Sequence, residues 1–348
     1  MNWTQTLMEW FYKNKRDFIW RKTKDPYRIW ISEIMLQQTR ASQGQTYYKK
    51  FIDVFPDLQT LALANQEKVL KLWQGLGYYS RAINLHSTAR YLYNEYEGKF
   101  PNTFNEIINL KGIGDYTASA IASICFDIPE AVVDGNVYRF LSRFFGISIP
   151  INTNNAHREF KKKATELMDF NNPGDFNQAI MEFGSIQCKP KNPLCHKCPF
   201  NKNCIAYKNQ KIDLFPIKKK NFKLKNRYFN YFIFQDGNKK TIVEKRNEND
   251  IWKNLFQFPL LELPKLNYKK DELLNQIRSK YNHKIKFANL QLWNSKPVIQ
   301  KLSHQKLHIF FWIINLKKWD SQDWTTVDDL KKLPIPIALQ NFIDNFYN

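Results

Sequence analysis

Hydrophobic positions in about the first three fifths of the chain recur with the period of an α-helix. Apolar residues three and four apart, separated by connectors that contain Pro and Gly, predict a series of helices between residues 3 and 207. Strand-like alternation is almost absent there. The predicted helices cover residues 7–13, 29–37, 43–55, 66–73, 81–96, two pieces within 103–125, then 137–145, 155–168 and 173–186.

The pattern changes after residue 207. Residues 208–226 are basic, contain Pro216 and lack periodicity, so they are expected to form a linker between domains. Strand patterns follow at 228–235 and 241–246, and the turn residues 236–238 between them predict a β-hairpin. A helix is predicted at 271–281 and a buried strand at 306–316. The expected architecture is an all-helical domain at 1–207 and a smaller α+β domain at 227–348.

Composition and charge narrow the class of protein. The 348 residues are 43% hydrophobic and 16% aromatic, enough for cores in two or three domains. The formal charge of +21 favours a polyanionic partner, nucleic acid before membrane, although part of it reflects a general richness in Lys. The N-terminus lacks the apolar block of a signal peptide, and no apolar run is long enough to span a membrane. A cytoplasmic protein is expected.

Four of the five cysteines lie close together and predict a metal centre. Their spacing is Cys188-x6-Cys195-x2-Cys198-x5-Cys204. Four thiolates suit zinc or an iron-sulfur cluster, although a zinc ribbon would normally contain two Cys-x2-Cys pairs and only one is present. Cys125 lies on the apolar face of a predicted helix and is expected to be a core thiol. His196 is expected to face solvent, because four cysteines already complete the site.

The region 103–137 combines a helical hairpin with a carboxylate. Thr103 and Glu106 form a helix-capping pattern, and Gly112 and Gly114 lie in the connection to a second helix. Glycines beside the free amides of a helix start can approach a DNA phosphate, although such a connection is also consistent with an ordinary tight turn. Asp134 precedes another helix, so it is either a capping residue or a functional carboxylate.

Taken together, these features resemble the helix-hairpin-helix DNA glycosylases of the endonuclease III superfamily, and within it the MutY family of adenine DNA glycosylases. The matching blocks are WISEIMLQQTR (30–40), QGLGYYSRAINLH (74–86), LKGIGDYTASA (110–120) and VVDGNVYR (132–139). The resemblance covers residues 3–207 strongly and the C-terminal domain weakly. It implies one four-iron four-sulfur cluster on the four cysteines and a monomer that acts on double-stranded DNA containing adenine opposite 8-oxoguanine or guanine.

The resemblance also assigns catalytic roles. Glu33 would protonate N7 of adenine, Asp134 would stabilise the sugar cation and Asn136 would help to position these groups. Bifunctional relatives carry a lysine nucleophile where this chain has Tyr116 beside the reacting centre. Without that lysine no Schiff base forms, so simple hydrolysis without efficient strand cleavage is expected. On residue patterns alone, an ordinary solvent-facing glutamate is the better interpretation of Glu33.

Base flipping and DNA contact imply further residues. By resemblance, Gln38 and Tyr78 are candidate wedges that fill the gap left by a flipped base, although both also suit ordinary turns. Lys189 and Lys191 form a short basic loop that either contacts phosphates or is merely solvated. Pocket and near-pocket positions, with Arg21 and Gln178 as the expected readers of adenine, are Arg16, Trp20, Arg21, Leu36, Gln178 and Glu182.

The C-terminal domain resembles the MutT-like (Nudix-like) domain of this family through residues 249–262, which contain Phe-Gln-Phe-Pro. No acidic helix of the pyrophosphatase type follows, so no magnesium site is expected. The family recognises 8-oxoguanine with a Phe-Ser-His loop, and this chain has Leu302, Ser303 and His304 there, so stacking on the lesion is reduced. Two alternatives remain open: a glycosylase for mismatched thymine or uracil, and a non-catalytic iron-sulfur DNA-binding protein.

Overall fold

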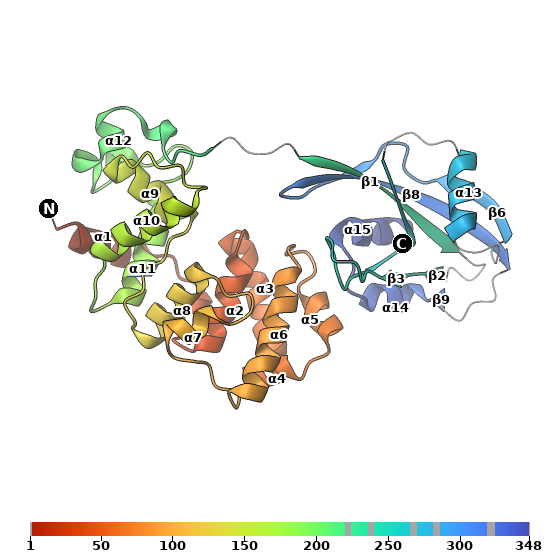
Figure 1. The fold of residues 1–348 in the computed structure, drawn as a ribbon, viewed down its shortest axis with the longest axis horizontal. Helices are drawn as coiled ribbons and strands as arrows, with labels where there is room; N and C mark the ends of the chain where they lie inside the picture. The colour runs from red at the N-terminus through yellow and green to blue at the C-terminus, as the bar shows by residue number, and fades with distance from the viewer. Residues whose placement is uncertain are drawn as a thin grey trace. The chain divides into compact units, whose positions relative to one another are not determined.

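The protein consists of two compact units. The computed structural model describes residues 2–219, 224–235, 240–264, 270–280, 286–318 and 324–347. The helical unit comprises Met1–Ala64 and Ile83–Lys220, and the sheet unit comprises Asn65–Ala82 and Asn221–Asn348 (Figure 1). The sequence analysis expected all of residues 1–207 in one domain, whereas the segment Asn65–Ala82 belongs to the sheet unit.

Most of the predicted helices of the helical unit are present, within a few residues of their expected ends. The α-helices are α1 (Trp3–Asn14), α2 (Pro26–Leu36), α3 (Ala41–Val54), α4 (Leu58–Ala62), α6 (Ser80–Glu95, beginning in the sheet unit), α7 (Phe104–Ile108), α8 (Asp115–Phe126), α9 (Gly135–Phe145), α10 (Asn154–Glu166), α11 (Pro173–Glu182) and α12 (Ile205–Lys208). Short 3-10 turns are η1 (Ile19–Lys22), η3 (Cys195–Lys197), η4 (Asn201–Asn203) and η5 (Ile212–Leu214). The short helices α4 and α12 were not predicted, because they are too short to show a periodic pattern.

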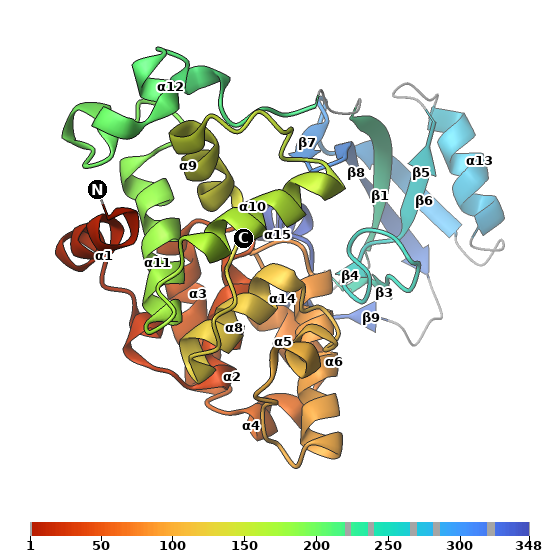
Figure 2. The ribbon, with the colours of Figure 1, turned by 60° about the vertical axis from the view of Figure 1, so that its left-hand side comes forward.

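The predicted helix at 173–186 is divided in the structure. The α-helical part α11 ends at Glu182, and a π-helical turn, η2 (Phe183–Gln187), follows directly. Gly184 lies in this turn, and a Cβ there would come within 2.5 Å of the backbone oxygen of Asn136. The turn therefore allows close approach of α9, which lies beside α11 in Figures 1 and 2.

A buried aromatic cluster joins the first helix to the cysteine loop. Trp3 of α1 stacks on Phe140 of α9 at 5.5 Å between ring centroids and contacts Phe200 at 5.3 Å. Phe183 lies 4.3 Å from Phe140 and 5.2 Å from Phe200. Because Phe200 lies between the third and fourth clustered cysteines, apolar packing anchors this part of the loop on α9.

The sheet unit contains a mixed sheet covered by helices on both faces. Its strand order is β5-β1-β8-β6, with β7 also paired to β8; β1 and β8 are parallel and the other pairs are antiparallel. The elements of the unit are α5 (Gln66–Leu72), β1 (Lys225–Gln235), β2 (Thr241–Ile242), β3 (Glu244–Lys245), β4 (Phe256–Gln257), β5 (Leu260–Leu263), α13 (Lys270–Lys280), β6 (Lys286–Leu292), β7 (Val298–Lys301), β8 (Gln305–Lys318), β9 (Trp324–Thr325), α14 (Val327–Lys332) and α15 (Ile337–Phe346).

Side chains of β1 alternate between the two cores of this unit. Phe229 and Tyr231 face a core completed by α14 and α15. Phe232 and Phe234 face the opposite core, which includes Ile277 of α13. The sheet therefore lies between α15 and α13, as Figure 1 shows. The period of two along β1 produces this two-sided burial.

The predicted helix at 271–281 and the predicted strand at 306–316 are confirmed as α13 and β8. The predicted hairpin between 228–235 and 241–246 is wrong. Strand β1 has β5 on one side and β8 on the other, so neither edge is free for the next strand. Instead β2 pairs with β9 and β3 with β4. The predicted turn at 236–238 lies outside the described residues.

The segment Asn65–Ala82 is held to the C-terminal part of the sheet unit by polar contacts. Lys71 Nζ donates hydrogen bonds to the carbonyl oxygens of Lys331 (2.6 Å) and Leu333 (3.0 Å), at the end of α14. Gln74 Nε2 donates to Gln340 Oε1 of α15 at 2.9 Å. These partners lie more than 250 residues away in the sequence, which explains why local patterns did not assign the segment to this unit.

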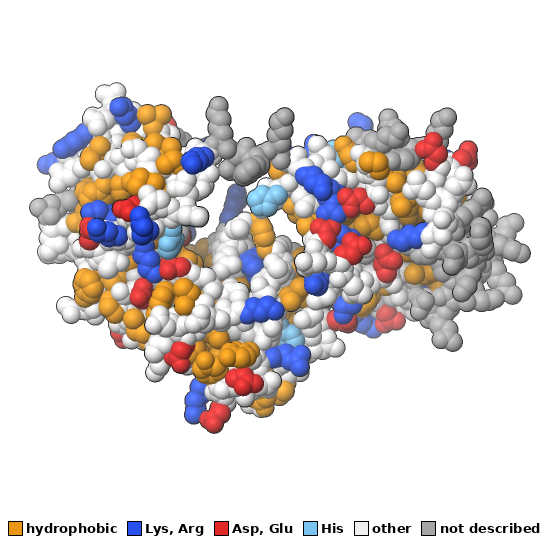
Figure 3. Space-filling view, in the orientation of Figure 1, with side chains coloured by type: hydrophobic (Ala, Val, Ile, Leu, Met, Phe, Trp, Pro, Cys, Tyr) orange, Lys and Arg blue, Asp and Glu red, His pale blue; other side chains and the backbone are white. Residues whose placement is uncertain are grey.

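Charged side chains are dispersed over the surface. On the face seen in Figure 3, Lys and Arg side chains are scattered over both units, several of them beside Asp or Glu side chains. The net charge of +21 is therefore not concentrated in one visible patch. Among the helices of the described ranges, none is both long and apolar enough to cross a membrane.

Candidate active site and DNA interface

Glu33 is a buried carboxyl on the inner face of α2. The helix begins at Pro26 after Asp25, whose side chain accepts a hydrogen bond from the Tyr27 amide. Only 6% of Glu33 is exposed. The hydroxyl of Tyr116, on α8, donates a 2.7 Å hydrogen bond to Glu33 Oε2. The structure thus brings together two predicted site residues that are 83 positions apart.

The surroundings of Glu33 favour its protonated form. Burial raises the pKa of Glu33, the hydrogen bond from Tyr116 lowers it, and the nearby charge of Asp134 raises it again, to about 7. Burial also raises the pKa of Tyr116 well above its ordinary value, so its hydroxyl remains a donor. A carboxyl with this pKa carries a proton for part of the time at neutral pH, as a general acid requires.

Asp134 is the N-cap of α9, as the capping interpretation predicted. Its Oδ1 accepts hydrogen bonds from the amides of Asn136 and Val137, each at 2.8 Å, and its Oδ2 accepts from Asn136 Nδ2 at 2.6 Å. Burial raises the pKa of Asp134, although these donors lower it. The charge of Asp134 raises the pKa values of both Glu33 and Tyr116. Asp134 therefore caps α9 and also lies close to these two groups.

The second buried carboxyl, Glu182, has a different environment. Its oxygens accept hydrogen bonds from Arg16 Nε (2.8 Å), Arg16 Nη2 (2.7 Å) and Arg21 Nη2 (3.0 Å). Burial raises the pKa of Glu182, but the hydrogen bonds from both arginines outweigh it and lower the pKa to about 2. Arg21, expected to read adenine, is thus engaged with Glu182 and with the carbonyl oxygen of Arg16.

The other predicted pocket residues have structural contacts. Trp20 is buried, stacks on Phe18 with ring centroids 4.8 Å apart, and meets Tyr48 edge-on. Leu36 packs against α3 so closely that a Cβ on Gly44 would lie 2.8 Å from it. Gln178 is half-buried on α11. Their packing roles are clear, and contact with a flipped base remains a prediction.

The fold requires a glycine at position 112 but not at position 114. Gly112 has φ +82°, and a Cβ there would lie 2.7 Å from Cβ of Asn84, so the fold itself requires glycine. Gly114 has an ordinary φ of −99°, and nothing lies within 4 Å of the position of its missing Cβ. It is exposed and is the N-cap of α8. The open space at Gly114 lies beside the free amides that begin this helix.

Both predicted wedge residues have a left-handed backbone. Gln38 has φ +57° and Tyr78 has φ +48°, and both are exposed. Such a conformation costs a non-glycine residue free energy and is often retained for function. Gln38 belongs to the helical unit and Tyr78 to the sheet unit. In the sheet unit the hydroxyl groups of Tyr78 and Ser303 are hydrogen-bonded, which joins two predicted DNA-contacting residues.

The turn between β7 and β8 presents Ser303 and His304 to solvent. The Leu302 amide donates to the Gln305 carbonyl oxygen at 2.8 Å and closes the turn. Leu302, at the position of the family's phenylalanine, packs partly into the core shared with α15. Its side chain therefore supports the turn from behind, while the two polar side chains remain exposed.

The four clustered cysteines line one cavity. Cys188, Cys195, Cys198 and Cys204 surround it together with Phe140, Phe144 and Arg143. Burial raises the pKa of Cys198 to about 12, and burial also raises the pKa values of Cys195 and Cys204. Such thiols ionise only with a compensating positive centre, so this donor set suits a cationic metal group. Within the described ranges, no three Cys, His, Asp or Glu side chains are grouped as the ligands of a single metal ion.

Two other sequence expectations concern residues near this loop. His196 is exposed, as predicted, and its Nδ1 lies 3.5 Å from the Tyr207 hydroxyl. Cys125 was expected in the core and is half-buried, and burial raises the pKa of its thiol to about 12. Lys191 is exposed and Lys189 half-buried, so the short basic loop is accessible in part.

Sequence reasoning missed two buried arginines of α9. Arg139 donates hydrogen bonds to the Cys188 carbonyl oxygen (2.8 Å), to Asn136 Oδ1 (2.7 Å) and to the Gly184 carbonyl oxygen (2.5 Å). Arg143 donates to the carbonyl oxygens of Lys189 at 2.7 Å and Pro190 at 3.2 Å in the loop. Arg139 thereby connects the cysteine loop to the residue that holds Asp134. Two arginines four positions apart in a helix of mainly apolar and aromatic residues were the available signal.

Comparisons with known proteins show to which family the chain belongs. Residues 31–168 match the family model of the HhH-GPD superfamily base excision DNA repair proteins, and residues 230–345 match the NUDIX domain. An adenine DNA glycosylase from Buchnera aphidicola subsp. Schizaphis graminum is 34% identical over 351 residues, covering 99% of this chain and 98% of the relative. The chain belongs to the adenine DNA glycosylase family. The human adenine DNA glycosylase is 41% identical over 210 residues, 58% of this chain and 38% of the human protein.

Solved structures resemble part of this member of the adenine DNA glycosylase family. A thermostable thymine-DNA glycosylase has a TM-score of 0.56 and 33% identity, covering 59% of this chain and 95% of that protein. An endonuclease III in a non-covalent DNA complex has a TM-score of 0.52 at 19% identity, covering 60% of this chain and 94% of that protein, and shows the shared fold. The architecture is thus a helix-hairpin-helix glycosylase domain followed by a Nudix-like α+β domain.

Proposed function

We propose that this protein removes adenine paired with 8-oxoguanine, and less efficiently adenine paired with guanine, from double-stranded DNA by hydrolysis of the N-glycosidic bond. The observation that carries the proposal is Glu33, a buried carboxyl with a pKa of about 7 that accepts a hydrogen bond from Tyr116 and is influenced by Asp134. Full-length similarity to adenine DNA glycosylases supports adenine as the base.

In the proposed reaction, Glu33 donates a proton to N7 of adenine, so that the bond between the sugar carbon and the base breaks with its electron pair going to the base. Asp134, directed by two helix amides and Asn136, stabilises the positive charge that develops on the sugar. Water then adds to the sugar carbon, and the proton that it loses returns to the Glu33 carboxylate, which restores the acid. Tyr116 cannot form a Schiff base, so the product is an abasic site and the strand stays intact.

DNA contact is proposed along several elements. The hairpin at Gly112 and Gly114 would bind a phosphate through the free amides of α8. Gln38 and Tyr78 would fill the gap left by the flipped adenine, since both are exposed on left-handed backbone. Arg21 and Gln178, with Arg16, Trp20, Leu36 and Glu182 around them, would form the pocket, and Lys189 and Lys191 would touch the backbone. The +21 charge supports a polyanionic partner.

One four-iron four-sulfur cluster is the proposed cofactor, held by Cys188, Cys195, Cys198 and Cys204. Four thiols line one cavity, and the chain has a single Cys-x2-Cys pair where a zinc ribbon would normally contain two, which favours a cluster over zinc. When bound, the cluster would supply a cationic centre that fixes the loop 188–204. Brown colour with absorption at about 400 nm would distinguish iron from zinc.

The sheet unit is proposed to recognise 8-oxoguanine, on the strand opposite adenine, through Ser303 and His304. The protein is proposed to act as a monomer.

A glycosylase for mismatched thymine is the second candidate, because the helical part resembles a thymine-DNA glycosylase. The match covers 95% of the thymine-DNA glycosylase but only 59% of this chain, so the rest of this chain has no counterpart in that structure. The fuller coverage by adenine DNA glycosylases favours adenine.

The deciding experiment measures base release from duplexes that contain one adenine opposite 8-oxoguanine, one adenine opposite guanine, or one thymine opposite guanine. Alkali reveals the abasic product, and strand cleavage without alkali would indicate lyase activity. Glu33→Gln and Asp134→Asn should abolish release, whereas the exposed control Glu95→Gln on α6 should not. Release at the wild-type rate by both active-site variants would refute the mechanism, and release of thymine alone would replace adenine as the substrate.

A further inference from the structure

The turn that carries Ser303 and His304 is backed by a strand and by a side chain. The Lys225 amide of β1 donates to the His304 carbonyl oxygen at 3.1 Å. Gln305 begins β8 directly after the turn, and its side chain is half-buried. Its Oε1 accepts a 2.9 Å hydrogen bond from Nη1 of Arg227. The geometry of two exposed recognition residues thus depends on what holds Gln305.

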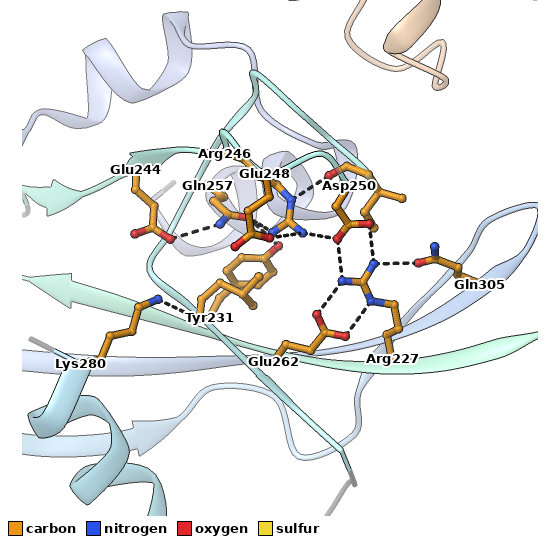
Figure 4. Close-up of polar contacts among 12 residues, drawn as sticks. Arg227, Tyr231, Glu244, Arg246, Glu248, Asp250, Gln257, Glu262, Lys280 and Gln305 are labelled. Atoms are coloured by element: carbon orange, nitrogen blue, oxygen red, sulfur yellow. Dashed lines mark hydrogen bonds and ion pairs between the residues drawn. The ribbon is translucent and has the colours of Figure 1, made fainter.

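Arg227 is a buried arginine whose five N–H groups all have acceptors (Figure 4). Nε and Nη2 donate to the two oxygens of Glu262 at 2.7 and 2.6 Å. Nη2 and Nη1 donate to the two oxygens of Asp250 at 2.7 and 2.9 Å. The fifth N–H, on Nη1, is the one that reaches Gln305. Two bidentate carboxylates therefore fix the plane of the guanidinium and aim its remaining donor at Gln305.

The cluster around Arg227 is itself fixed. Arg246 Nη2 donates to Asp250 Oδ2 at 2.6 Å, and the Arg227 guanidinium lies 4.8 Å from the centre of the Phe229 ring. Arg246 Nη2 also lies 3.6 Å from Oε2 of the exposed Glu248, so the two arginines face three carboxylates. The position of this cluster next to the turn is the feature that a purely structural cluster would not need.

We propose that Arg227 is a positioning residue for the Ser303–His304 turn, which it holds through Gln305, and that this contact sets the preference for 8-oxoguanine over guanine opposite adenine. The inference rests on the proposed function. If Arg227 only stabilises the sheet, losing its contact with Gln305 lowers stability and leaves the preference unchanged. If it positions the turn, the preference changes.

The test compares Gln305→Leu with Gln305→Glu. Leucine keeps a similar volume and removes the acceptor, whereas glutamate keeps an acceptor for Arg227. Gln291→Leu is the matched control, because Gln291 is exposed on β6 of the same sheet. Single-turnover rates at increasing enzyme concentration, on duplexes with adenine opposite 8-oxoguanine or guanine, separate the half-saturating concentration from the maximal rate. Thermal unfolding of each variant is measured in parallel.

Gln305→Leu should lower the ratio of efficiencies on the two duplexes about tenfold, the usual effect of losing a hydrogen bond to a charged group. The loss should appear in half-saturation on the 8-oxoguanine duplex, while Gln305→Glu and Gln291→Leu keep the wild-type ratio. An unchanged ratio in Gln305→Leu, or equal losses on both duplexes, would overturn the inference alone. A wild-type protein that releases no adenine would overturn the proposed function and this inference with it.

Discussion

Replacing Glu33 with glutamine should change the pH dependence of stability as well as abolish adenine release. The pKa of Glu33 is about 7 in the folded protein against 4.5 for an ordinary glutamate. Because the folded pKa is the higher one, the contribution of Glu33 to stability is fully present below pH 4.5 and is lost as pH rises to about 7. The cause is burial, which disfavours the ionised carboxylate.

The magnitude follows from the shift. Each unit of pKa corresponds to about 1.4 kcal/mol, so the titration of Glu33 should lower the free energy of unfolding by about 3 kcal/mol between pH 4.5 and 8. The glutamine of the Glu33→Gln variant does not titrate and keeps an oxygen that can accept the Tyr116 hydrogen bond. The stability of this variant relative to wild type should therefore rise by about that amount over the same pH range.

The assay is denaturant unfolding of both proteins between about pH 4.5 and 8, followed through the helical circular-dichroism signal. Titrating groups that do not interact with Glu33 cancel in the difference, whereas Asp134 is coupled to Glu33, so the difference reports the titration of Glu33 together with its effect on Asp134. Glu95→Gln, at an exposed position of the same unit, is the control. A flat difference for Glu33→Gln would show that Glu33 is ionised in the native protein at neutral pH, which would remove it as the general acid.

Three further changes test other parts of the site. Tyr116→Phe removes a hydrogen bond that lowers the pKa of Glu33, so the basic limb of the pH–rate profile should move to higher pH; an unmoved limb would contradict the contact. Gly112→Ala should lower the free energy of unfolding by about 2 kcal/mol, whereas Gly114→Ala should lower it by less than about 1 kcal/mol. Gly114→Ala should nevertheless weaken DNA binding about tenfold, and equal DNA affinity for this variant and wild type would refute the phosphate site. Arg143→Met removes two hydrogen bonds from a charged donor to the carbonyl oxygens of Lys189 and Pro190, each worth about 1.5–3 kcal/mol, so iron content and absorption at about 400 nm should fall. Full iron occupancy in this variant would show that Arg143 does not hold the loop.

Local patterns predicted what local physics determines. The Thr103 cap, the ends of most helices and the burial of β8 follow from capping, periodicity and apolar runs within a few residues. The identity of strand neighbours does not follow from such patterns. The expected hairpin after β1 failed because β1 is an inner strand whose partners, β5 and β8, lie well beyond the next strand in the sequence.

The candidate site was predictable in its residues more than in its environment. Resemblance supplied Glu33, Tyr116 and Asp134, but only the fold shows that Glu33 is buried and that Tyr116 donates to it. Arg139 was missed because its acceptors are backbone carbonyls and an amide oxygen, which leave no trace in a sequence motif. The grouping of Asn65–Ala82 with the sheet unit was hidden for the same reason, since its contacts include long-range hydrogen bonds to backbone carbonyls and to an amide side chain.

Burial alone does not select the acid of this site, because the helical unit buries more than one carboxyl. Glu33 and Glu182 are 6% and 2% exposed, so desolvation raises the pKa of both. Two arginines bind Glu182 and reverse the effect, leaving a pKa of about 2 and a permanently ionised group. The principal partner of Glu33 is a neutral hydroxyl, which offsets the cost of burial only in part, so its pKa stays at about 7. Partner chemistry therefore supports the proposal that Glu33, and not Glu182, donates the proton, and it leaves Glu182 to orient Arg16 and Arg21.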